Sequence, residues 1–301
     1  MSGKFDVCAE VTQIILDHLE AGVVPWRQPW DAGGAASLPL RVRGEPYRGV
    51  NVVLLWQKMV AQGYRSPTWM TYRQAGLLGG QVRKGETSTS VVKMDTYVKP
   101  GEADAVTGET GADQARRFMR AYRVFNVAQI DGLDQKFHAE PAPPRSFGTR
   151  ADPALLAWLA RTGIALEVTA EPQAYYSMSR DVIHMPPAET FEDGARHGGV
   201  LLHEACHASG HESRLNRLKP GMSQEERALE ELYAELGSAM VGARLGIAPE
   251  FEQNAAYLDS WVKALRSDSR AVLRAASTAQ RASDWLIGRG GLLDDPVLLA
   301  S

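Results

Sequence analysis

The chain has 301 residues, of which 44% are hydrophobic and 23% are charged, as in ordinary soluble globular proteins. This length is enough for two domains or for one large domain. It contains no run of about 18 apolar residues, which excludes a predicted transmembrane helix, and its N-terminus has no apolar signal core. Two cysteines, Cys8 and Cys206, are too few for a disulfide framework. We therefore expect a cytoplasmic protein.

The formal net charge of −3 is unevenly distributed. Residues 1–150 carry 19 Lys and Arg against 15 Asp and Glu, a net charge of +4, whereas the remainder carries 14 against 21, a net charge of −7. The segment 41–93 has nine basic residues, opposed only by Glu45 and Glu86. It also contains five aromatic residues: Tyr47, Trp56, Tyr64, Trp69 and Tyr72. This mixture suits a nucleic-acid groove, where cations follow phosphates and rings stack on bases, and it equally suits a basic surface over an aromatic core.

In chain order, the first half reads as helices followed by a hairpin. Apolar residues recur at helical spacing in three segments, and a glycine follows each of them. Two later segments, rich in β-branched and aromatic residues, flank a polar loop and read as strands. The predicted elements are helices over 5–20, 50–61 and 71–78, and strands over 87–98 and 117–127.

The second half follows a proline-rich stretch, 139–150, which we interpret as a linker between two domains, 1–138 and 151–301. Ser223 and Glu226 stand in capping-box positions before a long helix. The predicted elements are helices over 153–161, 224–245, 251–266 and 269–287, strands over 164–169, 174–178 and 181–185, and a helix that carries two histidines and begins after Gly198-Gly199. We therefore predict an α+β protein, with an N-terminal α+β domain and a mostly helical C-terminal domain that contains a small β-sheet.

The histidine-bearing helix contains the pattern H-E-x-x-H, from His203 to His207. Two histidines four residues apart lie about 40° apart on one helix face, so both imidazoles can reach one metal ion. Glu204 lies beside that face, where its carboxylate can take a proton from a water that the metal activates. A helix turns Cys206 about 100° away from His207, which favours a packed thiol over a ligand. Apolar residues on the opposite face are expected to pack inward: Leu201, Ala205 and Ala208.

A zinc peptidase site needs a third protein ligand. One class of these enzymes places a histidine six residues after the second histidine, but Ser213 stands there. The other common arrangement takes a glutamate from a following helix, with a polar residue one turn later that holds a histidine. Glu231 as the metal ligand and Glu235 as the holding residue fit this arrangement. A solvent-facing pair of glutamates is the alternative.

Two histidines and one glutamate would leave an open position for water, and Glu204 would accept its proton during attack on a carbonyl. Zinc is the expected metal, with manganese or another divalent ion as the alternative. The strand that starts near Tyr175 can hold an extended peptide by edge pairing. Five residues are alternatives as the donor that stabilises the oxyanion: Tyr175, Tyr176, His184, His197 and Tyr233.

Several separate motifs resemble ArdC-type antirestriction proteins. The N-terminal motifs are Tyr47-Arg48-Gly49-Val50-Asn51-Val52, Trp69-Met70-Thr71-Tyr72-Arg73-Gln74-Ala75, Gly80-Gln81-Val82-Arg83-Lys84-Gly85-Glu86 and Tyr122-Arg123-Val124-Phe125-Asn126-Val127-Ala128-Gln129. The C-terminal motifs are the H-E-x-x-H pattern, Gly210-His211-Glu212-Ser213-Arg214-Leu215-Asn216-Arg217 and Glu230-Glu231-Leu232-Tyr233-Ala234-Glu235-Leu236. The resemblance implies an N-terminal domain that binds single-stranded DNA, a C-terminal zincin-like metallopeptidase domain, and a role on plasmids and other mobile elements in protecting incoming DNA from host restriction.

The resemblance also implies roles for individual residues. His203, His207 and Glu231 are the implied metal ligands, and Glu204 is the implied catalytic carboxylate. The expected partners are single-stranded DNA and a protein substrate or the host restriction machinery, with no membrane. The predicted DNA contacts are basic and aromatic residues in or near the N-terminal motifs: Arg48, Trp56, Trp69, Tyr72, Arg73, Arg83, Lys84 and Arg123.

Three functions remain open. The first is an antirestriction protein with a working zinc peptidase domain. The second is a DNA-binding protein whose metal domain is proteolytically inactive and structural. The third is a regulatory metallopeptidase whose basic domain binds protein rather than DNA.

Overall fold

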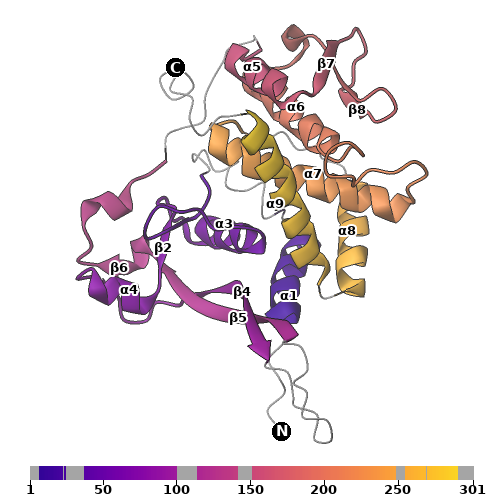
Figure 1. Ribbon diagram of the computed structural model, residues 1–301. Helices are drawn as coiled ribbons and strands as arrows, with labels where there is room; N and C mark the ends of the chain where they lie inside the picture. The colour runs from indigo at the N-terminus through magenta and orange to yellow at the C-terminus, as the bar shows by residue number, and fades with distance from the viewer. Residues whose placement is uncertain are drawn as a thin grey trace, which may run out of the picture.

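The chain folds into an N-terminal half and a C-terminal half, which lie side by side in Figure 1. The computed structural model describes residues 7–22, 24, 37–99, 114–141, 151–248, 255–268 and 270–290. Among these residues, no helix is long and apolar enough to cross a membrane. Most of the loop predicted between the two long strands, and most of the predicted linker 139–150, lie outside the described residues.

The N-terminal half is built on a four-stranded sheet with the strand order β1-β2-β5-β4. Its two long strands form an antiparallel ribbon in which Thr89 pairs with Val124 and Lys99 pairs with Gln114. Both long strands overlap the segments predicted from their β-branched and aromatic residues. The strands are β1 (Leu40–Arg41), β2 (Thr68–Met70), β4 (Thr89–Lys99) and β5 (Gln114–Asn126).

Two amphipathic helices, α1 (Val7–Glu20) and α3 (Val50–Gln62), pack beside this sheet. The side chain of Asn51 ties α3 to β4, because it donates to the carbonyl of Val92 and accepts from its N–H, both at 2.8 Å. The helix α3 ends at Gly63, whose φ of 66° suits the left-handed conformation of a helix C-cap.

A small subdomain projects from the sheet and is centred on α4 (Tyr72–Leu77). Thr71 and Gln74 form the capping box at its N-terminus. A separate small core holds this subdomain together and consists of Met70, Ala75, Val82, Val127 and Ile130. The other elements here are a two-stranded sheet of β3 (Gln81–Val82) and β6 (Ile130–Asp131) and the 3₁₀ turns η1 (Val127–Gln129) and η2 (Gln135–His138).

The C-terminal half consists of helices and a three-stranded sheet with the order β7-β9-β8. Asp152 caps the first helix through the backbone N–H of Ala154, and Ser223 with Glu226 forms the predicted capping box of the longest one. The elements are α5 (Pro153–Thr162), β7 (Ala165–Val168), β8 (Tyr175–Ser177), β9 (Val182–Met185), η3 (Ala188–Thr190), α6 (Gly194–Ala208), α7 (Gln224–Leu245), α8 (Ala255–Ser267) and α9 (Ala271–Gly290).

The two halves share a hydrophobic core. Val53 and Trp56 of α3 belong to the same buried cluster as Leu232 of α7 and Ala275 of α9. The helix α9 lies between the halves in Figure 1, and its Gln280 accepts a hydrogen bond of 2.9 Å from the backbone N–H of Gly49. The fold is therefore α+β, as predicted, while the boundaries 1–138 and 151–301 remain a prediction.

The helix α6 starts earlier than expected, at Gly194 rather than after Gly198-Gly199. Asp193 caps it by accepting a hydrogen bond from the backbone N–H of Arg196 at 2.7 Å, and this cap stabilises the extra turn. Gly198 lies within the helix, where a Cβ atom would come within 3.2 Å of Leu155. The glycine therefore permits close packing of α6 rather than marking its start.

Candidate functional site

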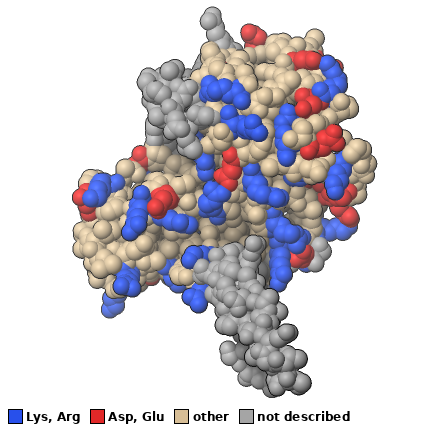
Figure 2. All heavy atoms as spheres, in the orientation of Figure 1, with Lys and Arg blue, Asp and Glu red and all other residues tan. Residues whose placement is uncertain are grey.

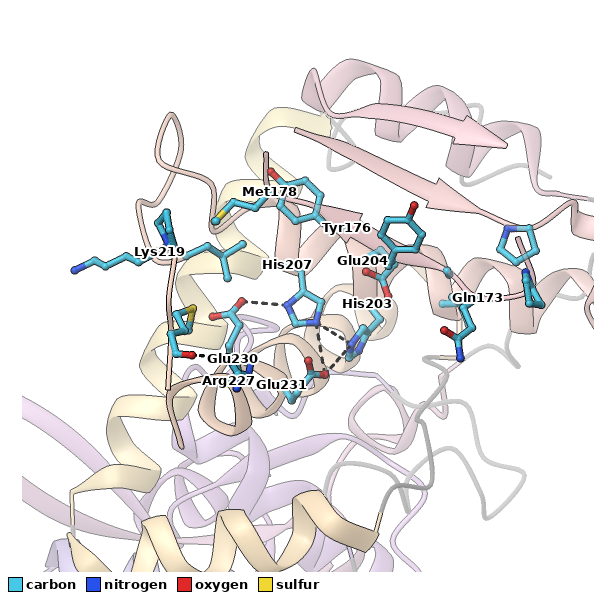
Figure 3. Close-up of a pocket in the computed structure, with 18 of the residues that line it drawn as sticks. Gln173, Tyr176, Met178, His203, Glu204, His207, Lys219, Arg227, Glu230 and Glu231 are labelled. Atoms are coloured by element: carbon cyan, nitrogen blue, oxygen red, sulfur yellow. Dashed lines mark hydrogen bonds and ion pairs between the residues drawn. The ribbon is translucent and has the colours of Figure 1, made fainter. Parts of the chain in front are cut away.

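The two histidines of the H-E-x-x-H pattern meet a glutamate from α7 (Figure 3). The Nε2 atoms of His203 and His207 lie 3.1 Å apart. The Oε2 atom of Glu231 lies 3.4 Å from the former and 3.6 Å from the latter. These three groups come from one turn of α6 and the facing turn of α7, so helix packing alone brings them together.

This donor set fits a divalent metal ion. Bonds of about 2.0–2.2 Å in a tetrahedral arrangement place neighbouring ligand atoms about 3.4 Å apart. All three measured separations lie close to that value. Two imidazoles and one carboxylate would leave a fourth position open on the side of the cavity, as in catalytic rather than structural zinc sites.

The close approach of α6 and α7 depends on small residues at their contact. A Cβ atom on Gly237 would lie 3.0 Å from the Sγ atom of Cys206. Burial raises the pKa of the Cys206 thiol to about 12, so this group stays protonated and packs as expected. The apolar face of α6 is also buried as predicted, with Leu201, Ala205 and Ala208 at 0% exposure.

Glu230, which the sequence analysis did not single out, contacts His207. Its Oε1 atom lies 3.2 Å from the Nδ1 atom of the imidazole. Arg217 binds the same carboxylate in a bidentate manner, with its Nε atom at 2.6 Å and its Nη2 atom at 2.8 Å. Such a carboxylate fixes the orientation of a metal-binding histidine and leaves its Nε2 atom free to face the metal. Glu235, the residue predicted to hold a histidine, is buried in α7 one turn further on.

Electrostatic interactions within the cluster favour the charged forms of His207 and Glu231. Burial lowers the pKa of His207, but its contacts with Glu230 and Glu231 outweigh burial and raise the pKa to about 10. Burial alone would raise the pKa of Glu231. Its contacts with His203 and His207 lower the pKa by more than burial raises it, so the pKa is well below its usual range. The carboxylates of Glu230 and Glu231 lie on either side of the His207 imidazole. This concentration of negative charge favours the binding of a cation, either a proton or a metal ion.

A cavity of about 1070 Å³ opens onto these residues. Glu204 lines it beside the two histidines and is 8% exposed. Two of the five alternative oxyanion donors, Tyr175 and Tyr176, also line it. The Tyr176 hydroxyl donates a hydrogen bond of 2.6 Å to Asp181, and burial, followed by this contact, raises the pKa of Tyr176. Tyr176 is therefore a protonated group at the edge of the cavity.

Two of the predicted DNA contacts are wrong as direct contacts. Trp56 and Trp69 are both 0% exposed, and Trp56 donates its indole N–H to the carbonyl of Ser37 at 2.8 Å. Stacking on a base requires an open ring face, which neither side chain offers. In this part of segment 41–93, the aromatic residues form the core, which was the alternative interpretation of its composition.

Other predicted contacts lie at the surface of the small subdomain. A groove of about 550 Å³ is lined by Tyr72, Arg83 and Lys84 among others. Tyr72 is 57% exposed, and Arg73 follows it on α4 with an exposed side chain. Arg83 is also exposed but is held by Glu86 at 2.7 Å and by Asp131 at 3.3 Å.

The remaining two predicted contacts lie apart from this groove. Arg123 is exposed on β5, opposite Ser90 of β4. Arg48 is 55% exposed and forms an ion pair with Asp284 of α9, so it contacts the C-terminal half. The groove therefore brings together Tyr72, Arg83 and Lys84, with Arg73 next to Tyr72 in the chain, but not Arg48 or Arg123.

Two protein-family models match the chain, one in each half. Residues 5–125 match the N-terminal domain of anti-restriction factor ArdC. Residues 153–278 match a zincin-like metallopeptidase domain. The second match includes α6 and α7, which carry the three side chains of the candidate metal site.

Three relatives resemble most of the chain. An uncharacterized protein, y4eC, of Sinorhizobium fredii (strain NBRC 101917 / NGR234) is 40% identical over 287 residues, which are 93% of this chain and 91% of the relative. DNA primase TraC of Escherichia coli is 34% identical over 292 residues, 92% of this chain but only 27% of the primase. The chain therefore spans about a quarter of that primase.

The third relative is the antirestriction ArdC protein from plasmid R388, known from two crystal structures. The metal-free structure has a TM-score of 0.85 and 45% identity, and the match covers 95% of this chain and 98% of that one. The Mn(II)-bound structure has a TM-score of 0.82 and 43% identity, with coverage of 96% and 100%. This chain therefore belongs to the ArdC family of antirestriction proteins, with the family's N-terminal domain and a zincin-like C-terminal domain.

Proposed function

We propose that this chain protects incoming DNA from host restriction, binding single-stranded DNA with its N-terminal half and hydrolysing a peptide bond with its C-terminal half. The observation that carries the peptidase part is the convergence of His203, His207 and Glu231 within 4.8 Å of one another, beside Glu204 in an open cavity. Membership in the ArdC family supports the antirestriction role and a place of action in the cytoplasm, where incoming DNA meets restriction enzymes.

His203, His207 and Glu231 would hold a divalent metal, with zinc as the default ion and manganese as the alternative that the Mn(II)-bound relative supports. When bound, the metal would acidify a water and polarise a carbonyl. The carboxylate of Glu204 would accept the proton of the attacking water. Glu230, held by Arg217, would keep the His207 ring in place through its Nδ1 atom.

The peptide would lie along β8. This strand is at one edge of the sheet, because the order is β7-β9-β8. It contacts α6, and Tyr175 and Tyr176 of β8 line the cavity. An extended peptide can pair with such an edge through main-chain hydrogen bonds.

Single-stranded DNA would bind the groove of the small subdomain. The exposed ring of Tyr72 can stack on a base, and the cations of Arg73, Lys84 and Arg123 can follow the phosphates. Arg83 would contribute less, since its charge is already balanced by Glu86 and Asp131.

The test compares three full-length proteins: wild type, Glu204→Gln and the double variant Arg73→Gln/Lys84→Gln. Affinity for a single-stranded oligonucleotide and transfer of unmodified plasmid DNA into a restricting host are measured for each. We expect the double variant to lose DNA affinity and protection, and Glu204→Gln to keep DNA affinity but lose protection.

Two results would contradict the proposal in different places. A wild-type protein that does not bind single-stranded DNA would refute the DNA part. Full protection by Glu204→Gln would show that peptide hydrolysis is unnecessary, and would favour the second candidate function, a DNA-binding protein with a structural metal domain.

A further inference from the structure

The exposed face of α9 is a row of arginines. Among the residues of this helix, Arg274, Ser277, Arg281, Gly288 and Arg289 are exposed, and Arg270 is exposed just before it. At 100° per residue, the four arginines fall within about 100° of one another around the helix. They therefore form a single stripe, which we call the α9 arginine stripe (Arg270, Arg274, Arg281 and Arg289).

Part of this positive charge is not balanced by nearby acids. The only acidic residue of α9, Asp284, contacts Arg48 and lies 3.7 Å from Arg244. Asp268 pairs with Arg274 at 2.5 Å. Asp268 also interacts electrostatically with Arg270. In the described part of the chain, the side chains of Arg281 and Arg289 have no ion-pair partner. This concentration stands out because residues 151–301 have a net charge of −7.

The stripe faces the same side of the molecule as the basic residues of the N-terminal half. Figure 2 shows blue side chains along the line that α9 takes through the centre of Figure 1, and further blue side chains over the N-terminal half beside it. The ion pair between Arg48 and Asp284 joins α9 to the N-terminal half. Because α9 belongs to the core that both halves share, the stripe is held against the N-terminal half.

The composition of the stripe indicates a polyanion rather than a folded protein partner. Hot spots of protein interfaces combine arginine with tryptophan and tyrosine in fully desolvated pockets at the centre. The exposed residues of α9 are arginine, serine and glycine, and Trp285 is only partly exposed, with the guanidinium groups of Arg214 and Arg289 each 5.8 Å from its ring centre. The contact with Trp285 also restrains Arg289, which lowers the entropy cost of binding a phosphate.

We propose that the α9 arginine stripe binds the phosphodiester backbone of single-stranded DNA, as a second contact surface in addition to the groove of the small subdomain. This inference rests on the proposed function in one respect, since it requires that the protein binds single-stranded DNA. It adds that the strand crosses onto the metallopeptidase half, and that this half contributes to DNA affinity.

The test measures the affinity of the full-length protein for a fluorescein-labelled 25-nucleotide oligothymidine by anisotropy at several salt concentrations. The variant Arg281→Gln/Arg289→Gln removes two unpaired charges from the stripe. Each phosphate contact to a single strand contributes about −0.7 to the slope of log affinity against log salt, so the slope should flatten by about 1.4 and affinity at 0.15 M salt should fall roughly tenfold.

Two further variants serve as controls. Arg180→Gln/Lys263→Gln removes the same charge from exposed residues of β8–β9 and α8 and should keep the wild-type slope. Arg281→Lys/Arg289→Lys should restore affinity, because a phosphate requires the charge rather than the guanidinium shape. Thermal unfolding shows whether each variant is folded.

An unchanged slope in Arg281→Gln/Arg289→Gln would overturn the inference, as would an equal loss in Arg180→Gln/Lys263→Gln, which would reduce the effect to net charge. Loss of binding in Arg73→Gln/Lys84→Gln with no effect of the stripe variant would refute only this inference. Absence of binding by the wild-type protein would refute the proposed function as well.

Discussion

The candidate metal centre and the proposed nucleic-acid surface are built in opposite ways. The metal centre consists of largely buried groups that contact one another, from His207 through Glu230 to Arg217, on two long helices. The proposed nucleic-acid surface consists of exposed side chains such as Tyr72 and Lys84 around a groove. A buried charged network requires every partner, whereas a surface for a flexible polyanion tolerates the loss of one contact. Mutations should therefore act sharply in the first region and gradually in the second.

The largest expected effect comes from replacing a buried aromatic residue of segment 41–93, compared with replacing an exposed one. Trp56→Ala should lower the free energy of unfolding by about 3–5 kcal/mol, because it removes a large buried side chain from the core shared by both halves. Tyr72→Ala should change stability by no more than about 0.5 kcal/mol. It should instead weaken single-stranded DNA binding by about 1–3 kcal/mol through the loss of stacking. Chemical denaturation measures the free energy of unfolding, and anisotropy measures DNA affinity. A Trp56→Ala protein as stable as wild type would show that Trp56 does not support the core.

Glu230→Gln tests whether the metal centre depends on the residue behind His207. Loss of such a supporting carboxylate typically costs 10–100-fold in metal affinity. Glu225→Gln, an exposed glutamate on the first turn of the same helix, is the matched control and should leave affinity unchanged. Competition with a chromogenic chelator measures both variants. Equal affinity of Glu230→Gln and wild type would show that Glu230 does not support the site.

The pH dependence of metal binding tests the charge of His207. Because its pKa is raised to about 10, the imidazole of the chelator-treated protein should carry an extra proton at pH 7 that the metal must displace. Metal affinity should therefore keep rising by about tenfold per pH unit between about pH 7 and 8.5. A histidine with an ordinary pKa of about 6.5 would give a curve that levels off above pH 7. Such a plateau would contradict the assigned charge.

The smallest expected effect concerns the contact between the halves at Arg48. This ion pair with Asp284 is partly exposed, so Arg48→Ala should lower stability by at most about 1 kcal/mol. Arg244 remains 3.7 Å from Asp284 and limits the loss further. Denaturation of Arg48→Ala beside wild type measures this, and a loss as large as that of Trp56→Ala would show that the ion pair, rather than the shared core, joins the halves.

The sequence predicts the convergence of His203, His207 and Glu231 because its determinants are local. The spacing of His203 and His207 fixes their common face, and the capping box at Ser223 fixes the start and phase of α7, which presents Glu231. Glu230 was missed because its role depends on Arg217, in a loop 13 residues earlier that no periodic pattern describes. The signal available in the sequence was the pair of adjacent glutamates, Glu230 and Glu231. A helix turns their side chains about 100° apart, so the two can contact different sides of one histidine.

The burial of Trp56 and Trp69 was not predicted because composition does not distinguish buried from exposed aromatic residues. Trp56 follows Val52 and Val53 at helical spacing on the apolar face of α3, a pattern that indicates the core. The α9 arginine stripe was missed for a different reason, since the negative total charge of residues 151–301 conceals a local row of cations. The start of α6 was misplaced because Gly198 and Gly199 were interpreted as a break, although Asp193 caps the helix upstream.

The most direct test of the central claim is the metal content of three full-length proteins after loading with zinc and removal of free metal. Wild type and Glu204→Gln should each retain about one equivalent of zinc, because Glu204 is not a ligand in this account. His203→Ala should retain almost none, because two ligands cannot hold the ion. Retention of a full equivalent by His203→Ala, or loss of the metal in a folded Glu204→Gln protein, would contradict the assignment of His203, His207 and Glu231 as the metal site.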